Sequence, residues 1–155
     1  MTNTADSPDP SPTVLVVEDE ALVAMLVADT LEEAGYRPLC SPDGRAGTAP
    51  PTSAARTAAA VVDLRLADGL DGRDVVRDLR HRRPALPVVV VTGFHPTAPE
   101  ADLRGLGGPT LRLCKPFDCD HLAGSVAAVM GAAAAASPPL VAPRRRRSDR
   151  VKEPA

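Results

Sequence analysis

The chain has 155 residues and a formal net charge of −2, and 44% of its residues are hydrophobic although only one Tyr and two Phe are present. This length suits one domain, whose core must be built from Val, Leu and Ala. Three cysteines without a CxxC pair argue against a disulfide framework or a zinc site. No apolar run reaches the roughly 18 residues of a membrane span, and the polar N-terminus is not a secretory signal. We therefore expect a soluble, cytoplasmic protein without membrane contact.

The two ends of the chain differ in composition from its middle. Residues 1–12 are polar and carry three prolines, and residues 137–155 are rich in Pro and Arg. We expect a flexible leader over 1–12, a folded domain over 13–136 and a disordered tail over 137–155. The Arg run of the tail is compatible with weak contacts to acidic partners or nucleic acid, and equally with a solubilising role. Because no helix-turn-helix pattern follows residue 130, a nucleic-acid partner is not expected.

Short apolar runs alternate with helical patterns through the middle of the chain. The run over 13–17 has no polar alternation, which indicates a strand buried on both faces. Apolar residues then recur at helical spacing over 19–34, and Gly35 supplies a stop. The later strands are expected over residues 36–40, 58–64, 87–92 and 111–114. The later helices are expected over 73–82 and 118–133, with only short helices near 52–57 and within 95–109, where Pro and Gly accumulate.

This order, a strand followed by a helix five times, predicts an α/β fold. Five parallel strands joined by right-handed helical crossovers form an open, doubly wound sheet, a three-layer sandwich with helices on both faces. In such sheets the ligand site lies beyond the carboxyl ends of the strands. The candidates for chemistry are therefore the residues that end the strands: Glu18, Asp19, Asp63, Thr92 and Lys115.

These side chains suit the transfer of a phosphoryl group. Several carboxylates at one edge attract a hard divalent cation, for which Mg²⁺ fits best. A carboxylate held on a strand, such as that of Asp63, can attack phosphorus and form an acyl phosphate. The metal and Lys115 would neutralise charge on the transferring group, and the hydroxyl of Thr92 would bond a phosphoryl oxygen.

Four segments at these strand ends resemble the motifs of a response-regulator receiver domain. They are residues 14–20 (VLVVEDE), 61–63 (VVD), 90–93 (VVTG) and 114–117 (CKPF). Each segment alone is a weak signal, but four in this order are specific, and the resemblance covers residues 13–130. It implies a flavodoxin-like (βα)5 fold and a part in two-component phosphorelay signalling.

The resemblance also implies a role for each site residue. Asp63 would be the phospho-acceptor, Thr92 the switch hydroxyl and Lys115 the amine that contacts the phosphate. The metal ligands would be Glu18, Asp19, Asp63 and, through its backbone carbonyl, Arg65.

The function expected from this resemblance is that of a stand-alone receiver. It would take a phosphoryl group from a histidine kinase or a histidine phosphotransfer protein onto Asp63 and would then signal through contacts with an output protein. It would catalyse only its own phosphorylation and dephosphorylation. The Asp-Gly pair at 71–72 and the Lys-Pro-Phe-Asp sequence at 115–118 particularly resemble receivers that act with hybrid histidine kinases.

Simpler explanations exist for each residue taken singly. Asp63 could end a turn, Asp19 could cap a helix and Lys115 could be a solvated charge. Lys115 resists this explanation best, because sixteen of the eighteen basic residues are Arg and a Lys here suggests a need for a compact ammonium. An alternative function is a pseudo-receiver, a protein-interaction module whose Asp63 is never phosphorylated. A phosphatase-type hydrolase is disfavoured, because Arg65 stands where such enzymes carry a second carboxylate.

Several positions depart from the family pattern. Glu18 replaces the more usual aspartate. Arg112 stands where many receivers carry an aromatic residue that reports phosphorylation, so Phe94 is expected to take part of that role. Phe94 also lies beside the route of water to the phosphoryl group, which predicts slow self-dephosphorylation. We expect the segment 95–109 to order only on phosphorylation or binding, and Cys114 to be a small core residue.

Overall fold

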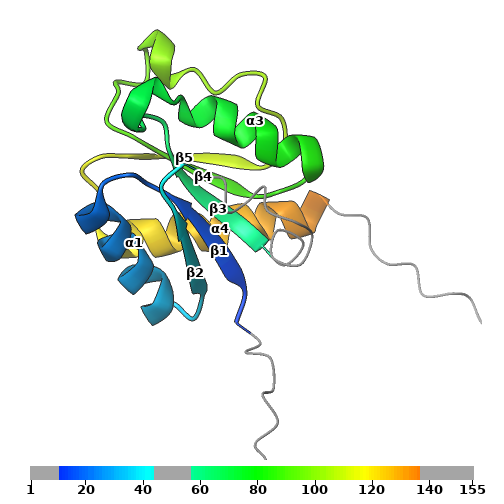
Figure 1. The fold of residues 1–155 in the computed structure, drawn as a ribbon. Coiled ribbons are helices and arrows are strands. Elements are labelled where there is room, and N and C mark those ends of the chain that lie inside the picture. Colours follow the sequence, from blue (N-terminus) through cyan, green and yellow to red (C-terminus); the bar gives the residue numbers. More distant parts are fainter. Residues whose placement is uncertain (1–10, 44–56, 137–155) are drawn as a thin grey trace, which may run out of the picture.

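The computed structural model of the chain describes residues 11–43 and 57–136. Within them, five parallel strands form one sheet in the spatial order β2-β1-β3-β4-β5 (Figure 1). The strands are β1 (Thr13–Val17), β2 (Arg37–Ser41), β3 (Thr57–Asp63), β4 (Val88–Thr92) and β5 (Thr110–Cys114). The parallel sheet is confirmed, and each strand end lies within one residue of its expected position. The expected tail and residues 1–10 of the expected leader lie outside the described residues. So does the short helix expected near 52–57, except for Thr57, which begins β3.

Three α-helices of the described residues cover the two faces of the sheet: α1 (Ala21–Glu33), α3 (Gly72–Arg82) and α4 (Cys119–Ala136). In Figure 1, α3 lies over one face, and α1 and α4 lie together on the other. The doubly wound, three-layer prediction is therefore confirmed. No helix in the two described ranges is both long and apolar enough to cross a membrane.

The apolar residues of the sheet divide between two cores. In β4, Val88 and Val90 belong to the core beneath α3, whereas Val89 and Val91 belong to the core beneath α1 and α4. Successive side chains of a strand point to opposite faces, so a strand covered on both sides needs apolar residues throughout. The four consecutive valines of β4 are therefore explained by helices that cover both faces of this strand.

The connection between β4 and β5, residues 93–109, differs from a regular βα repeat. The helical turn described there is a short 3₁₀ helix, η3 (Pro99–Ala101). Gly105, Gly107 and Gly108 follow with φ angles of 81°, 66° and 61°, which lie outside the α-helical region. The short helix expected within 95–109 is therefore confirmed as this single 3₁₀ turn.

A buried arginine holds this connection in place of helix packing. Arg80 of α3 is 6% exposed, and burial lowers the pKa of its guanidinium. Its nitrogens donate to the hydroxyl of Thr110 and to the backbone carbonyls of Leu86, Leu106, Gly107 and Pro109. Hydroxyl and carbonyl dipoles therefore solvate this charge, and the same bonds hold the glycine-rich segment against α3.

Candidate functional site

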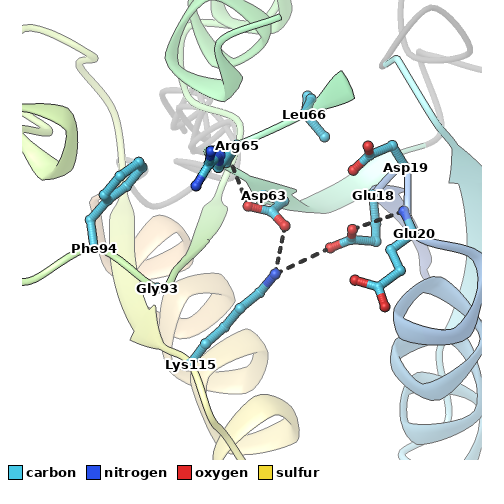
Figure 2. Close-up of a pocket in the computed structure, with 9 residues that line it drawn as sticks. All are labelled: Glu18, Asp19, Glu20, Asp63, Arg65, Leu66, Gly93, Phe94 and Lys115. Carbon is cyan, nitrogen blue, oxygen red and sulfur yellow. Dashed lines mark hydrogen bonds and ion pairs between the residues drawn. The ribbon is translucent and has the colours of Figure 1, made fainter. Parts of the chain in front are cut away.

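A cavity of about 460 Å³ opens at the carboxyl ends of β1, β3 and β5. Its lining residues are Glu18, Asp19, Glu20, Asp63, Arg65, Leu66, Gly93, Phe94 and Lys115. Figure 2 shows Lys115 reaching from the end of β5 to Asp63, with the acidic residues that follow β1 on the other side. Five of the six site residues expected from the sequence therefore line one cavity, and the sixth, Thr92, does not.

Asp63 is held by the strand that carries it and by the loop that follows. It is the last residue of β3 and is 5% exposed. Its Oδ1 accepts a hydrogen bond from the backbone N–H of Arg65 (2.9 Å), and its Oδ2 accepts one from Nζ of Lys115 (2.7 Å). A buried carboxylate held by two donors keeps a defined orientation at the cavity.

The start of α3 is built against Asp63. Asp71 caps this helix, because its carboxylate accepts from the backbone N–H of Arg73 (2.9 Å). A Cβ on Gly72 would lie 2.1 Å from the carbonyl oxygen of Asp63 and 2.7 Å from Cα of Leu64. Only glycine permits this approach, so the Asp-Gly pair sets the distance between the end of β3 and α3.

Glu18 lies buried next to Asp63. Its Oε1 accepts from the backbone N–H of Glu20 (3.1 Å). Burial and, after it, the side-chain hydrogen bond with Asp63 raise the pKa of Glu18 to about 7. The two carboxyl groups are thus close enough to repel each other when both are ionised, and a positive charge at the cavity relieves that repulsion.

Lys115 supplies a positive charge at this place. Its Nζ lies 2.7 Å from Oδ2 of Asp63 and 3.8 Å from Oε2 of Glu18. Burial lowers the pKa of Lys115, but the hydrogen bond to Asp63 and the charges of Asp63 and Glu18 outweigh this, and the pKa lies above its ordinary value. The ammonium is therefore charged at neutral pH and bridges the two carboxyl groups.

The acidic pair after β1 is divided between the inside and the rim of the cavity. Glu18, directly after β1, is buried, and Asp19, where the chain bends away from the strand, is exposed. The side chain of Arg65 is also exposed. Among residues 11–43 and 57–136, no three or more acidic, histidine or cysteine side chains lie together closely enough to hold a metal ion. The expected metal ligands therefore share a cavity but do not form a ready-made cluster of carboxylates.

Thr92 ends β4 and Phe94 comes two residues later, but only Phe94 lines the cavity. Thr92 is 1% exposed, and its Oγ1 accepts from the backbone N–H of Phe94 (3.0 Å). The ring of Phe94 is half-buried and lines the cavity (Figure 2). To bond a group on Asp63, the hydroxyl of Thr92 would have to turn from the Phe94 N–H toward the cavity.

Two residues of β5 show the effect of the shortened connection. Arg112 is half-buried, and its guanidinium donates to the carbonyl of Ala101 in η3. Cys114 is exposed, so the expectation of a core position is wrong. The reason is that β5 forms the edge of the sheet and the fourth repeat has no α-helix to cover it.

Sequence reasoning overlooked Leu66 and Glu20, which also line the cavity. Leu66 is 6% exposed and belongs to the core beneath α3. The alternation of Leu64, Arg65 and Leu66 continues the two-face pattern of β3 past Asp63, and this signal could have identified it. Glu20 is exposed and has no pattern of its own beyond its place after the acidic pair.

The fold and the cavity together define a class of protein. It is a doubly wound α/β protein with two buried carboxyl groups, bridged by a lysine, at the carboxyl edge of its sheet. The family model of the response regulator receiver domain matches residues 14–127. The chain therefore belongs to the response regulator receiver domain family, whose members act in two-component phosphorelay signalling.

Curated relatives and solved structures agree with this assignment. The photosynthetic apparatus regulatory protein RegA of Rhodovulum sulfidophilum is 36% identical over 115 residues, which are 74% of this chain and 61% of RegA. A CheY-like receiver domain protein from Methanospirillum hungatei JF-1 has a TM-score of 0.70 at 18% identity, covering 82% of this chain and 99% of its own. A sensor protein from Polaromonas sp. JS666 has a TM-score of 0.64 at 31% identity, covering 80% and 99%. The chain thus spans 61% of the length of the RegA relative.

Proposed function

We propose that Asp63 accepts a phosphoryl group from a phosphohistidine of a histidine kinase or a histidine phosphotransfer protein, and that the modified domain then changes its protein contacts. The observation that carries this proposal is the buried carboxylate of Asp63, bonded to Lys115 at 2.7 Å, in an open cavity at the end of β3. A carboxylate in this setting acts as a nucleophile toward phosphorus with a cation already beside it.

In the transfer, an oxygen of Asp63 forms a bond to phosphorus while the bond from phosphorus to the donor's imidazole nitrogen breaks. The electron pair of the broken bond returns to the imidazole. The ammonium of Lys115, already bonded to Oδ2 of Asp63, would then bind the negatively charged phosphoryl oxygens. The hydroxyl of Thr92 would turn from the Phe94 N–H and donate to one of these oxygens.

The donor set around the cavity suits Mg²⁺. Glu18 and Asp63 offer buried carboxylates, Asp19 offers one at the rim and Arg65 offers a backbone carbonyl, and Mg²⁺ is commonly held by one or two carboxylates with retained waters. A bound Mg²⁺ would neutralise charge on the phosphoryl oxygens. Because Lys115 bridges Glu18 and Asp63, metal binding would require Asp19 to turn inward and Lys115 to move away from Glu18.

The exposed face of α1 supports docking of the phosphodonor. Leu22, Met25 and Leu26 are 75%, 61% and 47% exposed, and their spacing puts them on one face of the helix. This helix begins directly after the acidic residues of the cavity. A donor domain placed on this face would bring its phosphohistidine close to Asp63.

The proposal also includes a stand-alone receiver in the cytoplasm that acts beside a hybrid histidine kinase. The likeness to a sensor protein at 31% identity supports the link to a hybrid histidine kinase. Immunoblotting of source cells with an antibody against residues 13–136 tests whether the receiver stands alone. A band far larger than a chain of 155 residues would contradict the stand-alone role.

Incubation with acetyl phosphate and Mg²⁺, followed by measurement of the intact mass, tests phosphorylation. The unaltered protein should gain one phosphoryl group, and Asp63→Asn should gain none. Asp68→Asn is the matched control, because Asp68 is an exposed carboxylate in the loop after β3. No gain in the unaltered protein, either from acetyl phosphate or from a phosphorylated histidine donor, would contradict the proposal.

A pseudo-receiver is the second candidate function. The observation that favours it is the ammonium of Lys115, which bridges the carboxyl groups that a metal would need. The domain would then bind partners through a surface such as the face of α1, whatever the state of Asp63. No phosphoryl gain from acetyl phosphate or from a phosphorylated histidine donor, with unchanged partner binding in Asp63→Asn, would favour this candidate.

A further inference from the structure

A line of contacts leads from the candidate site to the connection between β4 and β5. It starts in the loop after Asp63, which is closed by a β-bridge between Arg65 and Asp71. The backbone N–H of Leu66 also donates to the carbonyl of Leu70 (3.3 Å). The loop whose Arg65 carbonyl would be offered to a metal is therefore tied to Asp71 at its far end.

Arg73 joins Asp71 to the connection. Its Nε and Nη2 bind Oδ2 of Asp71 at 3.1 and 2.7 Å, and its Nη1 donates to the carbonyl of Pro99 at 3.2 Å. The side-chain bond between them raises the pKa of Arg73 and lowers that of Asp71, so both groups are charged at neutral pH. In Figure 1, the η3 turn lies above the N-terminal end of α3, where Arg73 is located.

These contacts cross a space that packed side chains do not fill. A cavity of about 370 Å³ lies between the loop, α3 and η3, and its lining includes Arg65, Leu70, Asp71, Arg73 and Glu100. Coupling between the loop and η3 therefore depends on the bonds that cross this space more than on packing. Arg80 and Arg112 also hold the connection by its carbonyls. Arg73 differs from both, because its other bonds end on the loop after Asp63.

We propose that Arg73 is a positioning residue that couples the loop after Asp63 to the β4–β5 connection. As a route for the phosphorylation signal, this inference rests on the proposed function. A group or metal that displaces the loop moves Asp71, and the guanidinium carries that displacement to Pro99 and η3. The donors of Arg73 are spread over three nitrogens of a planar fork that reach Asp71 and Pro99 together, whereas the donors of a Lys all share one nitrogen.

Hydrogen exchange of the resting protein tests the coupling without a phosphoryl group. In Arg73→Met and Arg73→Lys, the amides of Leu70 and Ala101 should exchange faster together, by about fivefold or more. Both amides donate to backbone carbonyls in the segments that Arg73 joins. Arg77→Met is the control, because Arg77 pairs with Asp74 on the same helix at 2.8 Å and both side chains are exposed. Unchanged exchange at Ala101 in Arg73→Met would overturn the proposal.

A second measurement separates coupling from a merely structural role. Acetyl phosphate and Mg²⁺ should change the exchange of the Ala101 amide in the unaltered protein. Arg73→Met should gain the phosphoryl group at a rate within about threefold of normal, a barrier change below about 1 kcal/mol, and should lose the exchange response. If Arg73→Met keeps the response, the coupling is wrong. If the unaltered protein gains no phosphoryl group, the proposed function fails, and the resting-state exchange still decides the coupling.

Discussion

The cavity at the edge of the sheet and the connection between β4 and β5 are held by different means. Glu18, Asp63 and Lys115 lie directly at the ends of strands, so the backbone of the sheet places them. The connection contains one short 3₁₀ helix within the described residues and is bonded through its carbonyls to arginine side chains. A side-chain bond can break singly, whereas a strand end moves only with its sheet. We therefore expect the connection to change shape more readily than the site.

Removal of the buried guanidinium should give the largest effect. Arg80→Met leaves the buried carbonyls of Leu86 and Leu106 without this donor, so the free energy of unfolding should fall by about 3 kcal/mol. Urea unfolding followed by circular dichroism measures this fall. Phosphoryl gain at Asp63 should persist in the folded protein, because the site depends on the sheet. The control Arg77→Met should cost less than about 0.5 kcal/mol, and an equally small cost for Arg80→Met would contradict the role given to Arg80.

A change at the site end should cost somewhat less but should also slow the chemistry. In Gly72→Ala, the new Cβ would lie 2.1 Å from the carbonyl oxygen of Asp63, so α3 must move away from β3. We expect a loss of about 2 kcal/mol in unfolding free energy and slower phosphoryl gain, because the backbone of Asp63 shifts. Gly124→Ala, in the exposed part of α4 with no atom within 4 Å of its Cβ, should stabilise the protein by about 0.5–1 kcal/mol. Normal phosphoryl gain in Gly72→Ala would contradict the prediction that the close approach of α3 positions Asp63 for the reaction.

The pH dependence of stability should reveal the buried carboxyl pair. Folding raises the pKa of Glu18 from 4.5 to about 7, so the folded state binds this proton more tightly than the unfolded state. The contribution of Glu18 to stability is therefore complete below pH 4.5 and is lost as the pH rises through 7. Without Mg²⁺, Glu18→Gln should be more stable than the unaltered protein by about 1–2 kcal/mol at pH 8 and about equally stable at pH 5.

Urea unfolding at the two pH values measures this difference. Glu33→Gln, at the exposed C-terminal end of α1, is the control and should show the same small change at both. A difference for Glu18→Gln that does not depend on pH would rule out the raised pKa. Arg80→Met should not create such a pH dependence, because the hydrogen bonds of Arg80 lead to the connection and not to Glu18 or Asp63.

Phe94 is the second residue of the connection and lines the cavity, and its removal should have the smallest effect. Phe94→Ala should speed loss of the phosphoryl group about fivefold, which is about 1 kcal/mol in the barrier, because water then reaches Asp63 more easily. The decay of phosphorylated mass after removal of acetyl phosphate measures this rate. Phe94→Leu, which keeps an apolar side chain, should change it less. A lifetime of only seconds in the unaltered protein would contradict slow self-dephosphorylation.

The elements and the neighbourhood of the site could be predicted from the sequence because both depend on local pattern. An unbroken apolar run indicates a doubly covered strand, and the carboxyl ends of parallel strands meet at one edge. The orientation of single side chains could not be predicted in this way. Thr92 faces the N–H of Phe94, and Asp19 stands at the rim while Glu18 turns inward. The role of Arg80 also escaped prediction, because its carbonyl partners Leu106 and Pro109 lie 26 and 29 residues away in the chain.

The identical valines of β4 leave its alignment with β3 and β5 poorly specified by the cores. If β4 slipped by one residue, a valine would replace a valine at most positions, so burial alone would not oppose the slip. The two ends oppose it. A slip in one direction puts Pro87, which has no N–H, where the N–H of Val88 donates to Pro109. A slip in the other direction moves Thr92 from its place beside the Phe94 N–H to the place of Val91 in the core beneath α1 and α4. Thr92 therefore also opposes a slip of β4, in addition to the hydroxyl role proposed for it.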